Sequence, residues 1–208
     1  MKRPASDACA IEDVSASVYS EVRSDKPPEK DDLRLLSDGK YLVLFNISKM
    51  NNVRNLCVTA QSFGYGTIMV GQAHGTLEEK ELKWGPGTDD NGLDVQRTSS
   101  MSNLARQLAA AGMPLYGIEI MEDAKSILDP ALMGSVPAGH ALMPGNEGSG
   151  LNAPQKRACT SFLYIPHYGH GTASLNVNVA TGICMHTIAF PVPVPVSLPL
   201  SLPVSASI

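Results

Sequence analysis

The sequence is poor in aromatic residues, and this scarcity argues against one class of RNA-binding module. Phe, Trp and Tyr together make up 5% of the 208 residues. Proteins that bind single-stranded nucleic acid by stacking successive bases on aromatic rings use several such side chains. The composition therefore disfavours a broad base-stacking platform. The net charge of −4 further implies that any RNA partner meets a local basic patch or a second subunit, because bulk charge would repel phosphates.

The cysteines lack the spacing of a zinc site or of a disulfide framework. No C-x-x-C pair occurs, and the four thiols are scattered at Cys9, Cys57, Cys159 and Cys184. This pattern favours reduced cysteines and an intracellular protein, either cytoplasmic or nuclear. His167 and His170 have no Cys or acidic partner at a recognised spacing, so we expect no metal site.

The chain also lacks an uninterrupted apolar segment that could enter a membrane. The N-terminus has no apolar core of a signal peptide, and residues 190–208 carry five prolines that forbid a regular helix. We expect 191–208 to be an extended, Pro-rich tail and the protein to have no membrane partner. Neither G-x-S-x-G nor a P-loop lysine motif is present, which disfavours hydrolases and nucleoside triphosphatases.

The middle of the chain has the pattern of one α/β domain. Residues 1–38 are polar and without sustained periodicity, so we expect a disordered leader, followed by a domain over 39–190. Apolar runs of strand length predict a parallel sheet, with strands at 41–46, 67–70, 115–120 and 161–165. Amphipathic segments between them predict flanking helices at 52–63, from 99 or 100 to 111, and from 175 or 176 to about 189.

Two local features of this pattern are specific enough to test. Asn52 is expected to cap the first helix, because an Asn side chain accepts hydrogen bonds from the first-turn amides. The polar stretch 71–97, with Trp84-Gly85-Pro86-Gly87, is expected to leave the sheet as an excursion.

Three segments, taken in order, then carry a joint pattern. The first is Asn52 with Thr59-Ala60 and Phe63-Gly64. The second is Gly145-Asn146-Glu147-Gly148-Ser149-Gly150-Leu151, and the third is Ile165-Pro166 with Ser174-Leu175-Asn176-Val177-Asn178-Val179-Ala180. Over about residues 41–188 the chain resembles the SpoU (TrmH) class of the SPOUT RNA 2′-O-ribose methyltransferases.

The resemblance implies a parallel sheet flanked by helices, whose C-terminal part is threaded as a deep trefoil knot. S-adenosyl-L-methionine would bind in the knot, held by positions that here are Leu142, Gly145, Ile165 and Leu175. The resemblance also implies a homodimer with an RNA site, for tRNA or rRNA, shared between subunits. His167 and His170 are then expected near the RNA.

The glycines of the second segment agree with a ligand-binding turn, because glycine lets the backbone approach a ligand closely. By itself the segment favours an ordinary surface turn, and only the Ile-Pro and Ser-Leu-Asn-Val pattern that follows it reverses this interpretation. A dinucleotide-binding G-x-G-x-x-G turn is disfavoured, since that motif follows the first strand.

Methyl transfer to a ribose hydroxyl needs alignment and a route for the hydroxyl proton. The resemblance assigns these tasks to side chains that here are Asn52, Glu147, Ser174 and Asn176, and we add Arg54 as a further catalytic candidate. From the residues alone, Glu147 is also explained as a turn or helix cap, and Ser174 as the N-cap of the last helix with Asn176 in its first turn.

The chain departs from the family at Val58, where the first motif normally has an arginine. A valine cannot stabilise an alkoxide or bind phosphate, and Arg54, one helical turn earlier, is the candidate substitute. The alternative hypothesis is therefore a catalytically weak, RNA-binding homologue. Pro144 before the glycine turn, and the end of helix-compatible sequence at Phe190-Pro191, are two further departures.

Overall fold

The computed structural model describes residues 33–35, 38–71, 95–168 and 174–191. The predicted leader 1–38, the centre of the predicted excursion, His170 and all but the first residue of the predicted Pro-rich tail fall largely or wholly outside these ranges. Leu33 and Leu35 pack against the core, so contacts with the domain extend six residues before the expected boundary at 39. The leader and tail stay predictions.

The described residues form one parallel sheet of seven strands in the order β3-β2-β1-β6-β4-β7-β5. Each neighbouring pair runs in the same direction. The strands are β1 Lys40–Leu44, β2 Gly66–Val70, β3 Val95–Thr98, β4 Leu115–Ile118, β5 Lys125–Ser126, β6 His140–Pro144 and β7 Ser161–Tyr164. The predicted α/β class with a parallel sheet is confirmed.

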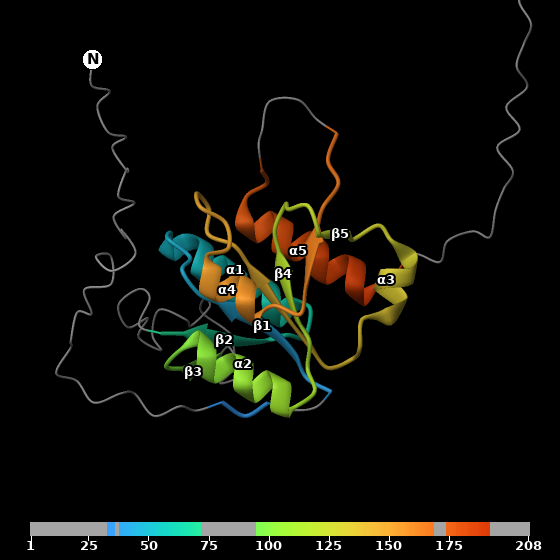
Figure 1. Cartoon of the computed structure of the whole chain (residues 1–208). Helices are drawn as coiled ribbons and strands as arrows, with labels where there is room; N and C mark the ends of the chain where they lie inside the picture. The colour runs from blue at the N-terminus through green and yellow to red at the C-terminus, as the bar shows by residue number, and fades with distance from the viewer. Residues whose placement is uncertain (1–32, 36–37, 72–94, 169–173, 192–208) are drawn as a thin grey trace, which may run out of the picture.

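Helices cover both faces of this sheet (Figure 1). One face carries α1 and α5, which pack against each other, and α2 packs against α4 on the other. The helices are α1 Met50–Ser62, α2 Met101–Ala110, α3 Pro130–Ser135, α4 Ala153–Ala158 and α5 Val177–Ala189. The sequence predicts either Ser99 or Ser100 as the cap of α2, and the structure shows Ser100 in that role, where it accepts a hydrogen bond from the Asn103 amide.

Side chains that point alternately to the two faces of the sheet produce two separate hydrophobic cores. In β1, Leu42 and Leu44 belong to the cluster beneath α1 and α5, whereas Tyr41 and Val43 belong to the cluster beneath α2. Successive side chains of a strand point to opposite faces, so a strand that is apolar throughout must be covered on both sides. The continuous apolar runs of the sequence reflect this double burial.

The structure corrects two of the local predictions. The α1 helix begins at Met50 with Lys49 at the N-cap, so the prediction that Asn52 caps it was wrong. Asn52 lies inside the first turn, where its side chain is buried. The predicted excursion also ends too late, because residues from Val95 onward form β3 at the sheet edge, paired with β2. A short polar edge strand has no apolar run to reveal it.

Three short elements were not predicted, although two of them carry clear signals. The α3 helix begins with Pro130 after Asp129, whose side chain accepts hydrogen bonds from two first-turn amides. The α4 helix has a reciprocal capping box between Asn152 and Gln155. Both follow the known preference for Asp or Asn at the N-cap and Pro in the first turn. The two-residue strand β5 is too short to show a pattern.

The C-terminal half has an unusual order of strands. β4 and β5 follow each other in sequence, yet β7 lies between them and pairs with both. The chain reaches β7 from α4 on one face and continues to α5 on the other face. The predicted trefoil knot requires the C-terminal part of the chain to be threaded through a loop, and the knot itself stays a prediction.

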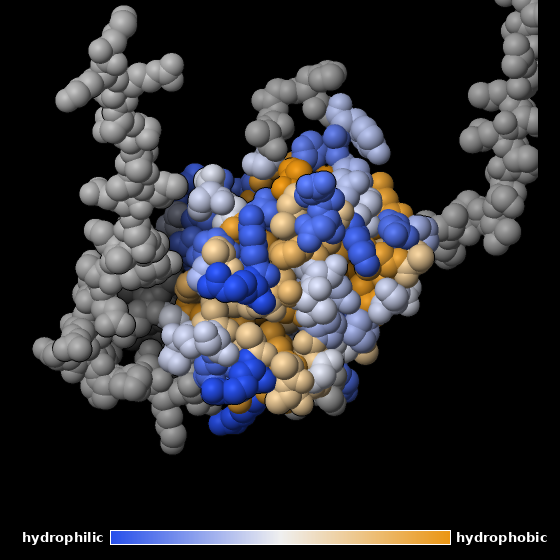
Figure 2. All heavy atoms as spheres, viewed as in Figure 1, coloured by the Kyte–Doolittle hydropathy of each residue, from blue (hydrophilic) through white to orange (hydrophobic). Residues whose placement is uncertain are grey.

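The surface of the domain mixes hydrophilic and apolar areas. Figure 2 shows hydrophilic side chains across the visible face and an apolar area around β5 and α3, where Leu128 is 62% exposed. In the described part of the chain, no helix combines the length and apolar composition that a bilayer crossing requires.

Candidate functional site

A cavity of about 610 Å³ opens where the carboxyl ends of β4, β6 and β7 meet the N-terminal ends of α1 and α5. Ligands of open parallel sheets commonly bind at this edge, because the loops that follow the strands converge there. Its lining includes parts of all three sequence motifs: Asn52 from the first, the whole turn 145–150 from the second, and residues 165 and 174–177 from the third.

The turn at 145–150 closes tightly on itself. Asn146 and Gly150 exchange two backbone hydrogen bonds of 3.0 Å, and the Asn146 side-chain oxygen accepts the amides of Gly148 and Ser149. A β-carbon on Gly145 would lie 2.8 Å from the carbonyl carbon of Gly150, and Gly150 has φ +66°. Glycine is thus required at both ends of the turn for steric and conformational reasons.

Glu147 projects from this turn onto the start of α1. Its carboxylate accepts hydrogen bonds from the amides of Ser48 (2.9 Å) and Lys49 (3.1 Å) and from Asn52 Nδ2 (2.7 Å). Lys49 at the N-cap provides no side-chain cap of its own. An acid placed at a helix N-terminus also interacts favourably with the helix dipole. Glu147 therefore caps α1 from a segment nearly one hundred residues away.

These contacts determine the charge state of Glu147. Burial acts to raise the pKa of the carboxyl group, but the hydrogen bonds from Ser48, Asn52 and Lys49 outweigh it and lower the pKa from 4.5 to about 2. Hydrogen bonds to the charged form of an acid favour ionisation. Near neutral pH Glu147 is consequently a carboxylate, which only accepts hydrogen bonds.

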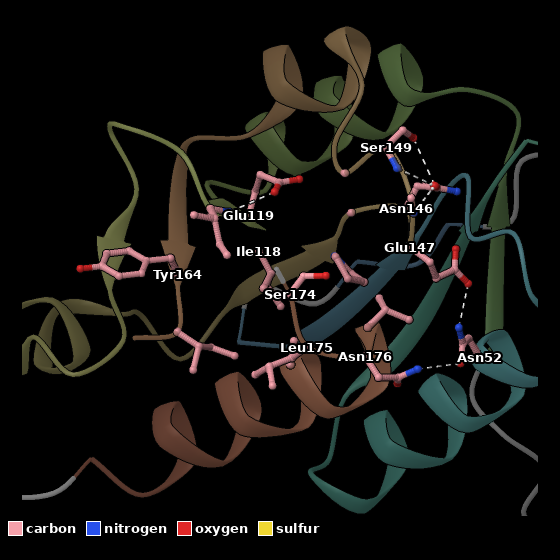
Figure 3. A pocket seen from close by; sticks show the side chains of 18 of the residues that line it. Asn52, Ile118, Glu119, Asn146, Glu147, Ser149, Tyr164, Ser174, Leu175 and Asn176 are labelled. Atoms are coloured by element: carbon pink, nitrogen blue, oxygen red, sulfur yellow. Dashed lines mark hydrogen bonds between the residues drawn. The ribbon is translucent and has the colours of Figure 1, made fainter. Parts of the chain in front are cut away.

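The ionised carboxylate orients two amides in series (Figure 3). Because Glu147 only accepts, Asn52 must turn its NH₂ group toward it and its oxygen toward Asn176. Asn176 Nδ2 then donates to that oxygen at 3.5 Å, and its own oxygen accepts the Asn178 amide as the N-cap of α5. One carboxylate thereby links the second motif to the first and third and to the N-termini of two helices.

The C-terminal motif differs in detail from the sequence-based alternative. Asn176, and not Ser174, is the N-cap residue of α5. Ser174 and Leu175 precede the helix and line the cavity together with Ile165 and Gly145. Helices α1 and α5 are also joined by a hydrogen bond from Thr59 Oγ1 to Asn178 Oδ1 (2.9 Å). The first and third motifs therefore contact each other directly.

Two of the predicted site residues do not line the cavity. Leu142 lies inside β6 with its side chain fully buried in the core beneath α1 and α5. Arg54 is exposed on α1, and Val58, one turn later, is half-buried on the same helix outside the cavity lining. The other seven predicted residues, catalytic and cofactor-binding, all line it.

The cavity also contains charged side chains that the sequence analysis did not assign. Lys49 lies at the start of α1 and Lys156 in the last turn of α4, so the lining has positive charge despite the net charge of the chain. Glu119 follows β4 and brings a second carboxylate. Isolated charged residues next to apolar runs are common, so none of these three was assigned a role from the sequence, although Glu119 lies within the region of the resemblance.

The described cysteines lie outside the cavity lining, and burial keeps their thiols protonated. Burial raises the pKa of the thiols to about 11 for Cys57 and about 12 for Cys159 and Cys184. Such thiols are protonated near neutrality and poor nucleophiles. Within the same residues, no group of three or more His, Cys, Asp or Glu side chains is placed to hold a metal ion.

Several curated proteins are similar to this chain over most of the described domain. A protein of Archaeoglobus fulgidus named an uncharacterized tRNA/rRNA methyltransferase is 26% identical over 161 residues, covering 75% of this chain and 67% of that protein. The 23S rRNA (guanosine(2553)-2′-O)-methyltransferase RlmP of Bacillus subtilis is 27% identical over 156 residues, covering 74% of this chain and 59% of the relative.

Solved structures share the fold at lower sequence identity. The SpoU methyltransferase AviRb from Streptomyces viridochromogenes superposes with a TM-score of 0.62 at 20% identity, covering 79% of this chain and 63% of AviRb. An AdoMet-bound rRNA methyltransferase from Sinorhizobium meliloti gives 0.55 at 22% identity, covering 77% and 59%. This chain thus spans about three fifths of the length of either protein.

A family model supplies the remaining comparison. The model of the SpoU rRNA Methylase family matches residues 39–186, which include the sheet, helices α1 to α4, most of α5 and every motif residue discussed above. The strand order and the convergence of the three motifs on one cavity agree with that match. The chain therefore belongs to the SpoU rRNA methylase family.

Proposed function

We propose that this chain transfers a methyl group from S-adenosyl-L-methionine to a ribose 2′-hydroxyl of tRNA or rRNA. The observation that carries the proposal is the hydrogen-bonded series Glu147–Asn52–Asn176, which joins all three motifs at one cavity. The names of the related proteins support RNA as the substrate.

The cavity suits an adenosyl ligand in size and chemistry. Its volume of about 610 Å³ falls within the range of small-molecule sites. Gly145 and Gly150 let the turn close tightly beside the cavity, and Leu163, Ile165 and Val177 provide an apolar wall for a flat base. When bound, S-adenosyl-L-methionine supplies an activated methyl group on sulfur.

The protein side chains position the substrate and neutralise charge around it. Asn176 and Ser174 lie at the N-terminus of α5, and Asn52 holds the amide of Asn176 in one orientation. Lys49 and Lys156 place positive charge in the cavity, where it would attract RNA phosphates. Arg54 is exposed and outside the lining, so it would have to act from the rim of the site.

A methyl-transfer assay tests the activity. The full chain is incubated with total RNA and S-adenosyl-L-methionine labelled in the methyl group, and the RNA is digested for nucleoside analysis. We expect labelled 2′-O-methylnucleosides, reduced by on the order of 100-fold in Glu147→Ala, the scale typical of lost preorganised polar groups. Label at the level of the Glu147→Ala sample would reject catalysis.

Val58 supports a second candidate function, a catalytically weak RNA-binding homologue. The side chain lies on α1 and provides no charge for an alkoxide or a phosphate. Restoring the arginine as Val58→Arg separates the two. A large gain in methyl transfer would indicate a disabled enzyme, whereas robust activity unchanged by the substitution would show that other groups suffice. Val58→Lys is the matched control for added charge without a bidentate guanidinium.

We also propose that the chain forms a homodimer through the exposed side of α5. Val179 and Ile183 are 49% and 36% exposed, and they border a shallow groove between α1 and α5. Light scattering of the full chain should give twice the monomer mass, and Ile183→Lys should shift it toward the monomer. Leu128→Lys, an exposed apolar position beside α3, is the matched control. A cytoplasmic or nuclear location stays a prediction.

A further inference from the structure

We propose that Glu119 is a positioning residue that holds the glycine turn 145–151 in its ligand-binding conformation. Its carboxylate lies just beyond the end of β4 and lines the cavity. The effect expected on ligand affinity depends on the proposed function, because it assumes that the turn binds an adenosyl group. The contact between the Glu119 carboxylate and the Leu151 amide, which we call the tether, does not depend on that assumption.

The first support is a long-range hydrogen bond to the end of the turn. Glu119 Oε2 accepts the Leu151 amide at 2.8 Å, and Oε1 accepts the Ile120 amide at 3.0 Å. Hydrogen bonds to an ionised acceptor are stronger than those between neutral groups. The turn is thus fastened to β4 at the residue where it passes into the segment before α4.

The second support is the fit of Leu151 against the same face of β4. Gly117 and Glu119 are two residues apart, so they face the same side of the extended chain. A β-carbon on Gly117 would lie 2.7 Å from Leu151 Cδ1, and Leu151 is buried with 3% exposure. Gly117 makes room for the Leu151 side chain while Glu119 binds its backbone amide. Gly117 and Glu119 together thus accommodate both the side chain and the backbone amide of Leu151.

The third support is steric. A β-carbon on Gly150 would overlap Glu119 Oε2, and the φ of Gly150 lies in the left-handed region. The carboxylate therefore occupies the space that a side chain at position 150 would need. The glycine and the acid are mutually dependent features of the turn.

The two carboxylates at the cavity connect the turn to different elements. Glu147 connects it to α1 and, through Asn52, to Asn176. Glu119 connects it to β4 and accepts hydrogen bonds from the amides of Leu151 and Ile120. Loss of Glu119 should consequently weaken ligand binding, whereas loss of Glu147 should also disturb the catalytic amides.

Amide hydrogen exchange of the full chain, without ligand, tests the tether. In Glu119→Ala we expect exchange of the Leu151 amide to accelerate on the order of tenfold, the effect of losing one hydrogen bond to a charged group. Glu122→Gln, an exposed acid three residues later, is the control and should leave that amide unchanged. Unaltered exchange at Leu151 in Glu119→Ala would overturn the proposal.

Glu119→Gln covers the case in which the alanine variant does not fold. The glutamine oxygen still accepts one amide, but its NH₂ group faces the other N–H donor, so one of the two contacts is lost. We expect exchange at Leu151 or at Ile120 to accelerate by several-fold in this variant. Wild-type exchange at both amides would contradict the tether.

Calorimetric binding of S-adenosylhomocysteine tests the consequence for the ligand. We expect Glu119→Ala to raise Kd and the KM for S-adenosyl-L-methionine about tenfold, with kcat at saturating cofactor within about twofold of wild type because the catalytic amides are untouched. A fall in kcat alone would indicate general damage and reject the assignment. If the wild-type chain binds no S-adenosylhomocysteine, the proposed function fails, while the exchange result at Leu151 still decides the tether.

Discussion

At the scale of single residues, the direction of each hydrogen bond follows from one ionised group. Glu147 only accepts, so the orientation of the Asn52 amide is determined, and the orientation of Asn176 follows from it. Amide nitrogen and oxygen would otherwise be interchangeable in these positions. The polar arrangement of the site therefore depends on the charge of Glu147.

Replacing this charge should reduce stability in a pH-dependent way. The folded pKa of Glu147 is about 2 and its ordinary value is 4.5. A depressed pKa contributes stability that is present above pH 4.5 and is lost as the pH falls toward 2. We expect Glu147→Gln to cost about 1 kcal/mol at neutral pH, the typical effect of a lost helix cap, as measured by urea unfolding.

In the same variant, the free energy of unfolding should depend less on pH in the acid range. Between pH 4.5 and 2 the free energy of unfolding should fall less in Glu147→Gln than in the wild type. Asp123→Asn, an exposed acid beyond β4, is the control and should follow the wild-type curve. Parallel curves for Glu147→Gln and wild type would contradict the assigned hydrogen bonds.

At the scale of elements, the short helix α4 makes buried polar contacts beneath the site. α4 has six residues, too few to be stable alone, and its Gln155 is completely buried. The Gln155 side chain accepts the Asn152 amide at 2.9 Å and donates to the Phe45 carbonyl at 3.3 Å. It thus connects the end of the cavity turn to the segment that follows β1.

Truncating this side chain should destabilise the domain. Gln155→Ala leaves the Asn152 amide and the Phe45 carbonyl without these partners, and we expect a loss of about 1–3 kcal/mol, as for other buried unsatisfied groups. Urea unfolding measures it. Arg157→Ala in the same helix is exposed and should change the free energy of unfolding by less than about 0.5 kcal/mol. Equal effects of the two substitutions would contradict the role given to Gln155.

At the scale of the whole molecule, a buried histidine at the amino end of β6 joins parts of the sheet that are distant in sequence. His140 Nδ1 lies 2.7 Å from the Pro137 carbonyl, and its Nε2 lies 2.7 Å from the Tyr65 hydroxyl. A carbonyl only accepts, so Nδ1 carries the proton and Nε2 accepts from Tyr65. Burial, opposed by the backbone hydrogen bonds, lowers the pKa of His140 from 6.5.

This depressed pKa should make the global stability fall at mildly acid pH. The unfolded chain takes up a proton at His140 below about pH 6.5, while the folded chain resists it, so stability decreases as the pH falls through the folded pKa. His140→Gln should flatten the curve of unfolding free energy below about pH 6.5, whereas His186→Gln, at an exposed position, should not. An unchanged slope in His140→Gln would refute this.

Comparing sequence and structure shows which features are local. The strands β1 and β2 were predicted because their apolar runs are continuous, and the cap of α2 because Ser100 stands before an amphipathic segment. The glycine turn was also predicted from a local feature, because its geometry requires glycine at positions 145 and 150. Seven of nine expected site residues line one cavity because the motifs lie at element ends.

The predictions that failed depend on distant partners. Asn52 does not cap α1 because Glu147, far along the chain, performs that role, and β3 forms because β2 offers a free edge. Leu142 is buried by helices on its face of the sheet, and Glu119 becomes relevant only where Leu151 meets it. None of these contacts leaves a periodic signal in the chain.

The sequence by itself determined the alternation of strands and helices, the glycine turn and the residues of the three motifs, because these depend on local backbone preference and on burial periodicity. The tertiary structure alone decided the order of the strands, the capping of α1 by Glu147 and the tether from Glu119 to Leu151. Those features arise when parallel strands bring their carboxyl ends together, and a hydrogen bond between residues far apart in sequence has no local signature.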